Sequence, residues 1–354
     1  MKYLSILFLL LISFSSFSQK KKDIKVIDIV VTEKNFYPGK QFSIGVHSIL
    51  HNGKEIKTRG LLKGKSPWRD YSISVNGGKY KLGKVTLSEN FHDFKNEEFT
   101  ITIRSNKTKT ATITKTFKLN YKGYQIARYN GKNGQDGFDG NNGSTGKDGN
   151  GTNGKDGKPA QDGETGKYVI VYAKTEKRDS IDFLKIIVED VITKIKSRYI
   201  VNTNGGKITI DVSGGQGGEG GNGGKGGKGR NQSESASAGV GGNGGNGANG
   251  GNGGDAGSIT LFMDSTTYKN YKEFIILKVD GGIAGEYGQG GRKGKGGKTD
   301  KEANAIGQVL GTDRAKKGKN GDNGESGEDG NDGKITIQIF EEIEVDFWIS
   351  LTKT

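Results

Sequence analysis

Glycine recurs at nearly every third position in six tracts of this chain, and the tracts form three pairs. The pairs are 131–149 with 154–166, 214–229 with 241–257, and 281–297 with 318–333. An extended left-handed helix has about three residues per turn, so this period places the glycines along one edge. Short strand-like runs abut most of the outer ends. The pattern predicts three out-and-back hairpins of polyglycine-II helix that project from a β-structured base.

The number of glycine edges differs between tracts. Residues 214–229 and 241–257 follow a G-G-x repeat with two bare edges, whereas 131–166 and 318–333 follow G-x-y with one. A bare edge lets a neighbouring backbone approach closely, because no Cβ intervenes. We therefore expect 214–229, 241–257 and also the intermediate tract 281–297 inside the bundle, with the others outside.

Other structures are compatible with 62 glycines in 354 residues. A flexible linker is the main alternative, because ordering glycine costs more backbone entropy than ordering any other residue. Matched tract lengths and strict phase favour order. A collagen triple helix fits poorly, since Pro159 is the only proline of the G-x-y runs and Ala160 occupies a glycine position. The full nonapeptide G-G-x-G-x-D-x-apolar-x of calcium-binding β-rolls is absent.

Over about 131–340 the repeat pattern resembles two known uses of a polyglycine-II bundle. One is the receptor-binding adhesin at the tip of bacteriophage tail fibres, and the other is the springtail antifreeze protein. The chain is also similar to secreted glycine-rich or collagen-like proteins of Bacteroidota. The resemblance implies a glycine-helix lattice that presents loops. Outward Asn, Lys, Asp, Glu and Gln side chains, and the absence of cysteine, depart from the antifreeze pattern.

The sequence predicts an all-β protein in three parts. Residues 1–18 have the basic start and short apolar core of a secretory signal, which predicts an extracytoplasmic, secreted or cell-surface protein. Residues 20–121 predict an immunoglobulin-like β-sandwich with Trp68 as a core aromatic. Residues 122–354 predict a β-base with about six polyglycine-II helices.

Alternating or β-branched apolar residues mark the expected strands. They are 25–32, 41–48, 68–75, 98–104 and 111–121 in the sandwich, and 168–174, 184–189, 194–202, 207–212, 258–263, 274–279 and 334–340 in the base. Segment 183–195 also fits a helical stripe, but its six β-branched residues favour strands.

Composition argues against an enzyme. There is no cysteine, the three histidines are His47, His51 and His92, and no nucleophile elbow, zinc-binding helix or phosphate loop is present. We therefore expect no catalytic residue, metal or cofactor. The net charge of +14 is typical of a solvated basic surface with no specific partner, and it also fits attraction to anionic partners. The near absence of aromatic residues from the repeats makes nucleic acid an unlikely partner.

The breaks between paired tracts are the candidate binding loops, because binding residues concentrate in polar, irregular loops. The breaks are 150–153, 230–239 and 298–317. The candidate binding residues are Arg230, Asn231, Gln232, Lys298, Lys301, Ile306, Val309, Leu310, Arg314, Lys316 and Lys317. The expected function is structural or adhesive, with an anionic glycan or a cell-surface or envelope protein as partner. The alternative is an accessory subunit of a periplasmic or outer-membrane complex.

Overall fold

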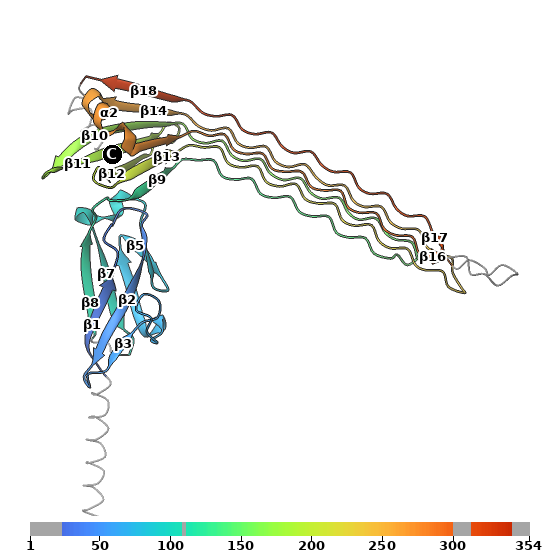
Figure 1. Cartoon of the computed structure of the whole chain (residues 1–354), viewed down its shortest axis with the longest axis horizontal. Helices are drawn as coiled ribbons and strands as arrows, with labels where there is room; N and C mark the ends of the chain where they lie inside the picture. The colour runs from blue at the N-terminus through green and yellow to red at the C-terminus, as the bar shows by residue number, and fades with distance from the viewer. Residues whose placement is uncertain (1–22, 108–110, 300–312, 342–354) are drawn as a thin grey trace, which may run out of the picture.

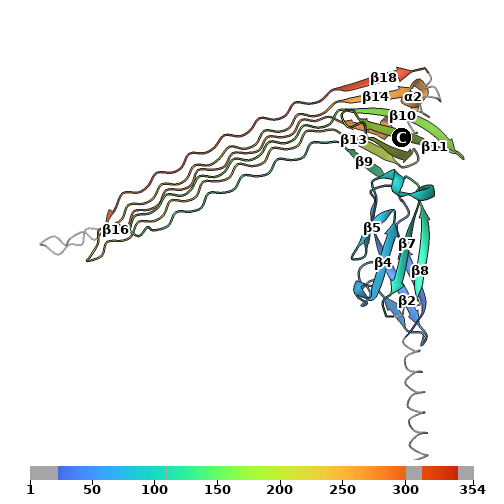
Figure 2. The ribbon, with the colours of Figure 1, turned by 180° about the vertical axis from the view of Figure 1, so that it is seen from behind.

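The computed structural model describes residues 23–107, 111–299 and 313–341, and strands dominate it. Strands account for 37% and helix for 6%, in several sheets, so the prediction of a mostly β-structured chain is confirmed. Figure 1 shows two strand-rich regions at one end and a long narrow projection from the second. We call this projection, residues 131–166, 214–257 and 281–333 as far as described, the arm. Figure 2 shows the same side-by-side course of its segments from behind.

The N-terminal region consists of two antiparallel sheets packed on one core. One sheet has the order β1-β2-β6-β5 with β3 paired to β2, and the other has the order β4-β7-β8. The strands are β1 (Ile24–Val31), β2 (Gln41–Leu50), β3 (Glu55–Lys57), β4 (Tyr71–Asn76), β5 (Gly78–Lys81), β6 (Lys84–Leu87), β7 (Glu98–Ser105) and β8 (Thr112–Lys118). Stacked and edge-on phenylalanines, including Phe36, Phe42 and Phe99, fill the core.

Three strands of this region were not expected from the sequence, because β3, β5 and β6 are only three or four residues long. The segment predicted as strand 68–75 begins with the 3-10 helix η1 (Trp68–Asp70) and continues as β4. Trp68 is half-buried at the margin of the core, edge-on to Tyr80 at 5.8 Å. Two further 3-10 helices, η2 (Phe91–Asp93) and η3 (Lys95–Glu97), precede β7.

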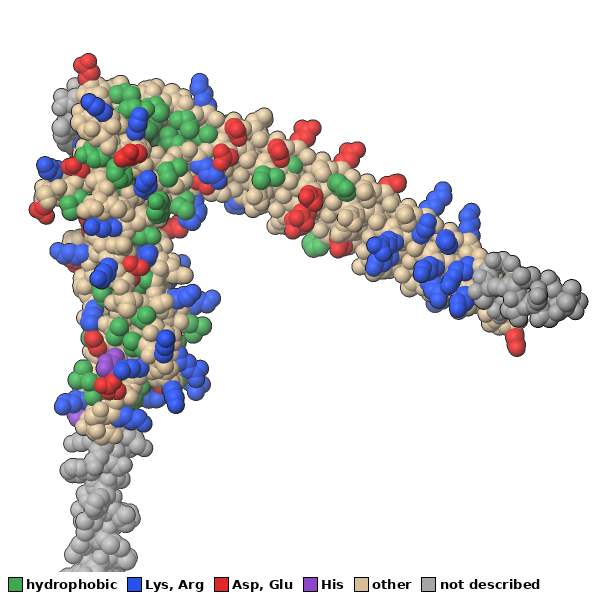
Figure 3. All heavy atoms as spheres, viewed as in Figure 1, with side chains coloured by type: hydrophobic (Ala, Val, Ile, Leu, Met, Phe, Trp, Pro, Cys, Tyr) green, Lys and Arg blue, Asp and Glu red, His purple; other side chains and the backbone are tan. Residues whose placement is uncertain are grey.

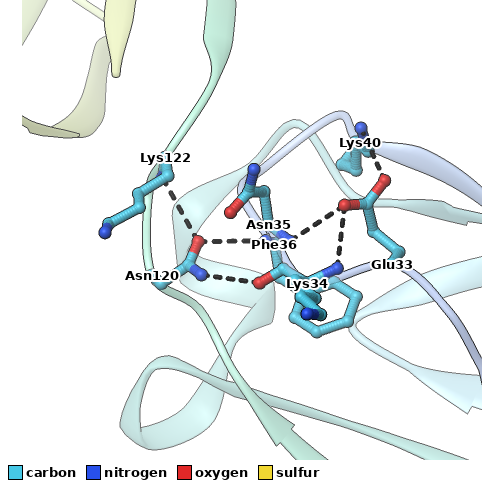
Figure 4. A network of polar contacts seen from close by, with 7 residues as sticks. All are labelled: Glu33, Lys34, Asn35, Phe36, Lys40, Asn120 and Lys122. Atoms are coloured by element: carbon cyan, nitrogen blue, oxygen red, sulfur yellow. Dashed lines mark hydrogen bonds and ion pairs between the residues drawn. The ribbon is translucent and has the colours of Figure 1, made fainter. Parts of the chain in front are cut away.

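Asn120 lies where the chain passes from the N-terminal region to the second region, and its side chain is hydrogen-bonded to three backbone groups there (Figure 4). Its Oδ1 accepts hydrogen bonds from the backbone amides of Phe36 and Lys122, and its Nδ2 donates to the Lys34 carbonyl at 2.7 Å. Its carbonyl accepts from Asn202 of the second region. One core also includes side chains from both regions, among them Tyr121 and Phe183. The two regions are therefore packed against each other.

The second region, the base, contains two sheets around an aliphatic core. One sheet has the order β12-β11-β10-β14-β18 and the other has the order β15-β13-β9. The strands are β9 (Tyr124–Arg128), β10 (Val169–Arg178), β11 (Ile181–Asp190), β12 (Lys196–Asn202), β13 (Lys207–Asp211), β14 (Ile259–Asp264), β15 (Ile275–Lys278) and β18 (Ile335–Phe340). The strand interpretation of 183–195 is confirmed for its first part by β11, which is followed by a turn.

Two elements of the base were missed in the sequence. Strand β9 is short and directly precedes the first glycine tract. Helix α2 (Ser265–Tyr271) begins at Asp264, whose side chain caps the Thr267 amide at 2.8 Å; it is followed by the 3-10 helix η4 (Lys272–Phe274). No helix among the described residues is long and apolar enough to cross a bilayer.

The base sheets set the order of the glycine tracts. Strands β9, β13 and β15 pair in parallel and lead into the outbound tracts 131–149, 214–229 and 281–297. Strands β10, β14 and β18 also pair in parallel and receive the return tracts 154–166, 241–257 and 318–333. Because extended strand and extended tract differ little in φ and ψ, each tract continues its strand. The arm therefore has an outbound row and a return row of three tracts each.

Candidate functional site: the distal end of the arm

Backbone hydrogen bonds join the six tracts with a strict three-residue repeat. Gly134, Gly137 and Gly140 donate to Gln216, Glu219 and Asn222, each at 2.7 Å. The same offset recurs between every pair of bonded tracts. Tracts 214–229 and 241–257 each bond to four neighbours, 154–166 and 281–297 to three, and 131–149 and 318–333 to two. The backbone groups of the arm thus find partners as those of a sheet do.

The two innermost tracts are those with two glycine edges, as the sequence predicted. A Cβ added at Gly220 or Gly247 would lie within 3.0 Å of a carbonyl oxygen of a neighbouring tract, which real Cβ atoms do not show. Tract 281–297 is less enclosed than expected, because it has the same number of neighbours as 154–166. A single glycine edge therefore suffices for three contacts at the side of the bundle.

The asparagines and aspartates of the repeats have a structural role that sequence reasoning missed. Their Oδ1 atoms accept hydrogen bonds from backbone amides of the adjacent tract that face no carbonyl. Asn243 accepts from the Lys319 amide at 2.8 Å, and Asp136 accepts from the Glu219 amide at 2.9 Å. We call this series of hydrogen bonds from backbone amides to Asn and Asp side chains the Asn/Asp ladder. Asn and Asp recur with the same three-residue period as glycine, and this recurrence could have predicted the ladder.

Charge is segregated along the arm. Hydrogen-bonded triplets from the six tracts align as six layers. The four layers next to the base contain thirteen acidic and three basic side chains, and the two distal layers contain ten basic and one acidic. The distal set comprises Lys155, Lys225, Lys228, Arg230, Arg292, Lys293, Lys295, Lys316, Lys317 and Lys319, with Asp156 as the acid. We call these two layers the basic collar; Figure 3 shows blue side chains gathered there and red ones nearer the base.

The three tract breaks lie together at the far end of the arm. The Arg230 amide donates to Gly149, the residue just before the first break, and the Gln232 amide donates to Lys298 of the third. Strands β16 (Lys298–Thr299) and β17 (Asp313–Arg314) close the third break as a two-residue ladder. The structure thus brings Arg230, Gln232 and Lys298 into one cluster.

Not every predicted loop residue is available to a ligand in the same way. The Asn231 Oδ1 accepts from the Lys298 amide at 3.0 Å and holds two breaks together. Arg314 donates to the Gly296 carbonyl at 3.3 Å, while the side chains of Lys316 and Lys317 are exposed within the collar. Lys301, Ile306, Val309 and Leu310 lie outside the described residues.

A polar groove of about 570 Å³ runs along the return row within the collar. Asn153 of the first break and tracts 154–166, 241–257 and 318–333 line it; the tracts contribute Lys155, Asp156, Asn243, Asn246, Lys319 and Asn320, together with two glycines. Sequence reasoning missed these residues as a group, because they meet only when three tracts distant in sequence are placed in register. Aligning the sequences of the three hairpins at their breaks would have shown that basic residues gather in the triplets nearest the breaks.

Two smaller hollows lie where the base meets the N-terminal region. The first, about 240 Å³, includes Arg128, which is paired with Glu89 at 2.9 Å. The second, about 300 Å³, includes Arg178, which is paired with Glu97 at 2.7 Å and with Glu176. These ion pairs join segments of the fold. No group of three or more potential metal ligands was found in the described part of the chain.

One buried carboxylate fixes the arm to the base. Asp190, at the end of β11, accepts from the Lys167 ammonium at 2.8 Å and from the amides of Ile192 and Thr193. Burial acts to raise the pKa of Asp190, but these hydrogen bonds outweigh it and lower the pKa to about 2. Lys167 directly follows the first return tract, so the pair anchors that tract where it leads into β10.

Comparison with protein-family models, with curated proteins and with solved structures found no match to this chain. The function of this chain is therefore inferred from the geometry of the arm.

Proposed function

We propose that this is a non-enzymatic, extracytoplasmic adhesion protein whose arm is a bundle of six polyglycine-II helices. The three-residue hydrogen-bond repeat and the bare glycine edges support that conformation. The two-sheet N-terminal region fits an immunoglobulin-like sandwich. In this proposal the N-terminal region and the base hold the arm, and the distal end attaches to an anionic glycan surface.

The segregation of charge along the arm is the observation on which the proposal depends. At about 3.1 Å per residue, the acidic part is about 37 Å long and the basic collar about 19 Å. Both exceed the screening length of about 8 Å at physiological ionic strength, so the two charges do not cancel at a distance. An anionic surface repels the acidic part and attracts the collar. The arm is therefore expected to approach such a surface end-on.

The alternative function, an accessory subunit of an envelope complex, is favoured by one observation. Strand β18 is an edge strand, and its Ile335, Ile337 and Ile339 are 40%, 43% and 50% exposed. An edge strand can accept a strand from another protein. In that case the arm acts as a rigid spacer.

Lysine footprinting tests the end-on attachment. The full-length protein is incubated with heparin-coated beads or with neutral dextran beads, and its lysines are then acylated. We expect protection of Lys225, Lys295 and Lys316 on heparin only, with Lys25 and Lys118 of the N-terminal region equally reactive on both supports. Protection confined to the N-terminal region would contradict the proposal, and stoichiometric capture of a membrane protein from envelope fractions would favour the accessory role.

A further inference from the structure

The asparagines that line the groove of the return row have only hydrogen-bond donors left for a ligand. The Oδ1 atoms of Asn153 and Asn243 accept from the amides of Asn243 and Lys319, each at 2.8 Å. Those of Asn246 and Asn320 accept from the amides of Asp322 and Lys293, at 2.9 and 3.0 Å. Because a backbone amide can only donate, each oxygen is assigned to the bundle and each Nδ2 is directed away from it.

None of these four Nδ2 groups has a hydrogen-bond partner among the described residues, and all four side chains are exposed. Lys155 and Lys319, on the same groove, likewise have no ion-pair partner there, and an ammonium is also a pure donor. The single opposing group is Asp156, whose Oδ1 accepts from the Asn246 amide at 2.6 Å. The groove is thus rich in donors, with one carboxylate beside them.

We propose that this groove is a binding site for a linear acidic polysaccharide, a ligand that offers only acceptors in its carboxylate or sulfate groups. Charged acceptors form the stronger hydrogen bonds with such donors. The donors repeat every three residues, about 9 Å along the arm, so a polymer lying along the row meets several of them. This inference rests on the proposed attachment of the collar to anionic glycans and identifies the groove as the site of that attachment.

The Asn/Asp ladder provides variants that change the groove without changing the bundle. Aspartate already fills equivalent ladder positions, as at Asp136 and Asp162, so Asn→Asp retains the acceptor for the neighbouring amide. In the double variant Asn243→Asp/Asn320→Asp, two ligand-facing donors become anionic acceptors. The matched control Asn249→Asp/Asn252→Asp makes the same charge change at ladder positions outside the collar and the groove, where the two Oδ1 atoms accept from the amides of Glu325 and Glu328 at 3.0 and 2.9 Å.

A gain of binding provides the second test. Asp156→Asn retains the acceptor for the Asn246 amide, removes the negative charge and adds a donor to the groove. The matched control is Asp162→Asn in the same tract, whose Oδ1 accepts from the Asn252 amide at 2.6 Å. Misfolding cannot explain tighter binding, so this variant remains informative if the double variant loses stability.

The dissociation constants of the intact protein for heparin fragments, polygalacturonate and neutral dextran are measured by titration calorimetry. Polygalacturonate carries only carboxylates whereas heparin also carries sulfates, so binding to heparin alone would show that the groove requires sulfate. We expect Asn243→Asp/Asn320→Asp to weaken binding at least about tenfold and Asp156→Asn to tighten it severalfold, with each control changing it less than about twofold. Melting temperatures should stay close to wild type.

Two results would overturn the inference, and they are distinguishable. If the wild type binds an acidic polymer but the groove variants behave as their controls do, the groove is not the site and the proposed attachment still stands. If the folded wild type binds neither acidic polymer more tightly than dextran, the proposed attachment fails together with the groove.

Discussion

Within each triplet of the arm, the residues have separate tasks. Glycine lets two backbones approach, Asn or Asp, where present, accepts a neighbouring amide, and in the G-x-y tracts the remaining side chain faces solvent. Gly247 and Asn246 illustrate the first two, since Gly247 faces the Gly288 carbonyl and Asn246 accepts from the Asp322 amide. Substitutions at adjacent positions should therefore have very different costs.

Gly247→Val should destabilise the arm severely, by more than about 4 kcal/mol, because the added side chain must displace the backbone of tract 281–297. Asn246→Val should cost only about 1 kcal/mol, since it removes one hydrogen bond at an exposed position. Thermal unfolding followed by circular dichroism measures both. Equal losses at the two sites would contradict the assignment of glycine edges.

Asp190 should make stability depend on acid pH. Its folded-state pKa is lowered from 3.8 to about 2, so its contribution is present above the unfolded value and is lost as pH falls through the folded one. We expect Asp190→Asn to cost roughly 2 kcal/mol at pH 6 and almost nothing at pH 2. Urea unfolding of both proteins from pH 6 to pH 2 tests this expectation, and a pH-independent difference would contradict it.

Each tract is held to its neighbours by ladders of hydrogen bonds from backbone amides to Asn and Asp side chains. Some positions of these ladders lack an Asn or Asp. Asp332, Asp329, Asn323 and Asn320 of the last return tract accept amides of tract 281–297. Ser326 stands at the vacant position of this series. The Tyr287 amide opposite it has no hydrogen-bond partner among the described residues.

Ser326→Asn should fill this gap and stabilise the arm by about 0.5–1 kcal/mol, the usual net value of one hydrogen bond. Ser326→Ala is the control and should be nearly neutral. Amide exchange gives the direct measurement, since the Tyr287 amide should become protected in the asparagine variant alone. An unprotected Tyr287 amide there would show that the ladder does not extend to this site.

At the scale of the whole molecule, the arm is a stack of equivalent layers between the base and the breaks. Each layer takes one triplet from every tract, and the base sheets fix which tracts are neighbours. The length of the arm is therefore set by the number of triplets, and all six tracts must contain the same number.

Removing one triplet from all six tracts should shorten the arm by about 9 Å and preserve the fold. The matched deletion is 135–137, 160–162, 219–221, 249–251, 286–288 and 325–327, which form one layer. Deleting 219–221 alone should instead misalign tract 214–229 with its four neighbours and lower the melting temperature strongly. Small-angle scattering gives the maximum dimension, and an unchanged dimension in the six-fold deletion would contradict the layered architecture.

The strand-rich class, the paired tracts and the inner position of the two G-G-x tracts could all be predicted from the residue pattern. Periodicity carries this information because a bare edge is a local property of the repeat. It also located most strands of both regions, whose alternating residues are read over a few positions. Strands β3, β5 and β6 were too short to give that signal.

Which residues share a layer depends on how the strands of the base pair, and this is a property of the folded molecule. Lys155 and Lys319 are 164 positions apart in the sequence yet line one groove, because parallel pairing of β10, β14 and β18 places their tracts in register. The role of the asparagines was hidden for the same reason. Whether an exposed Asn faces water or a neighbouring amide depends on a partner that only the assembled bundle supplies.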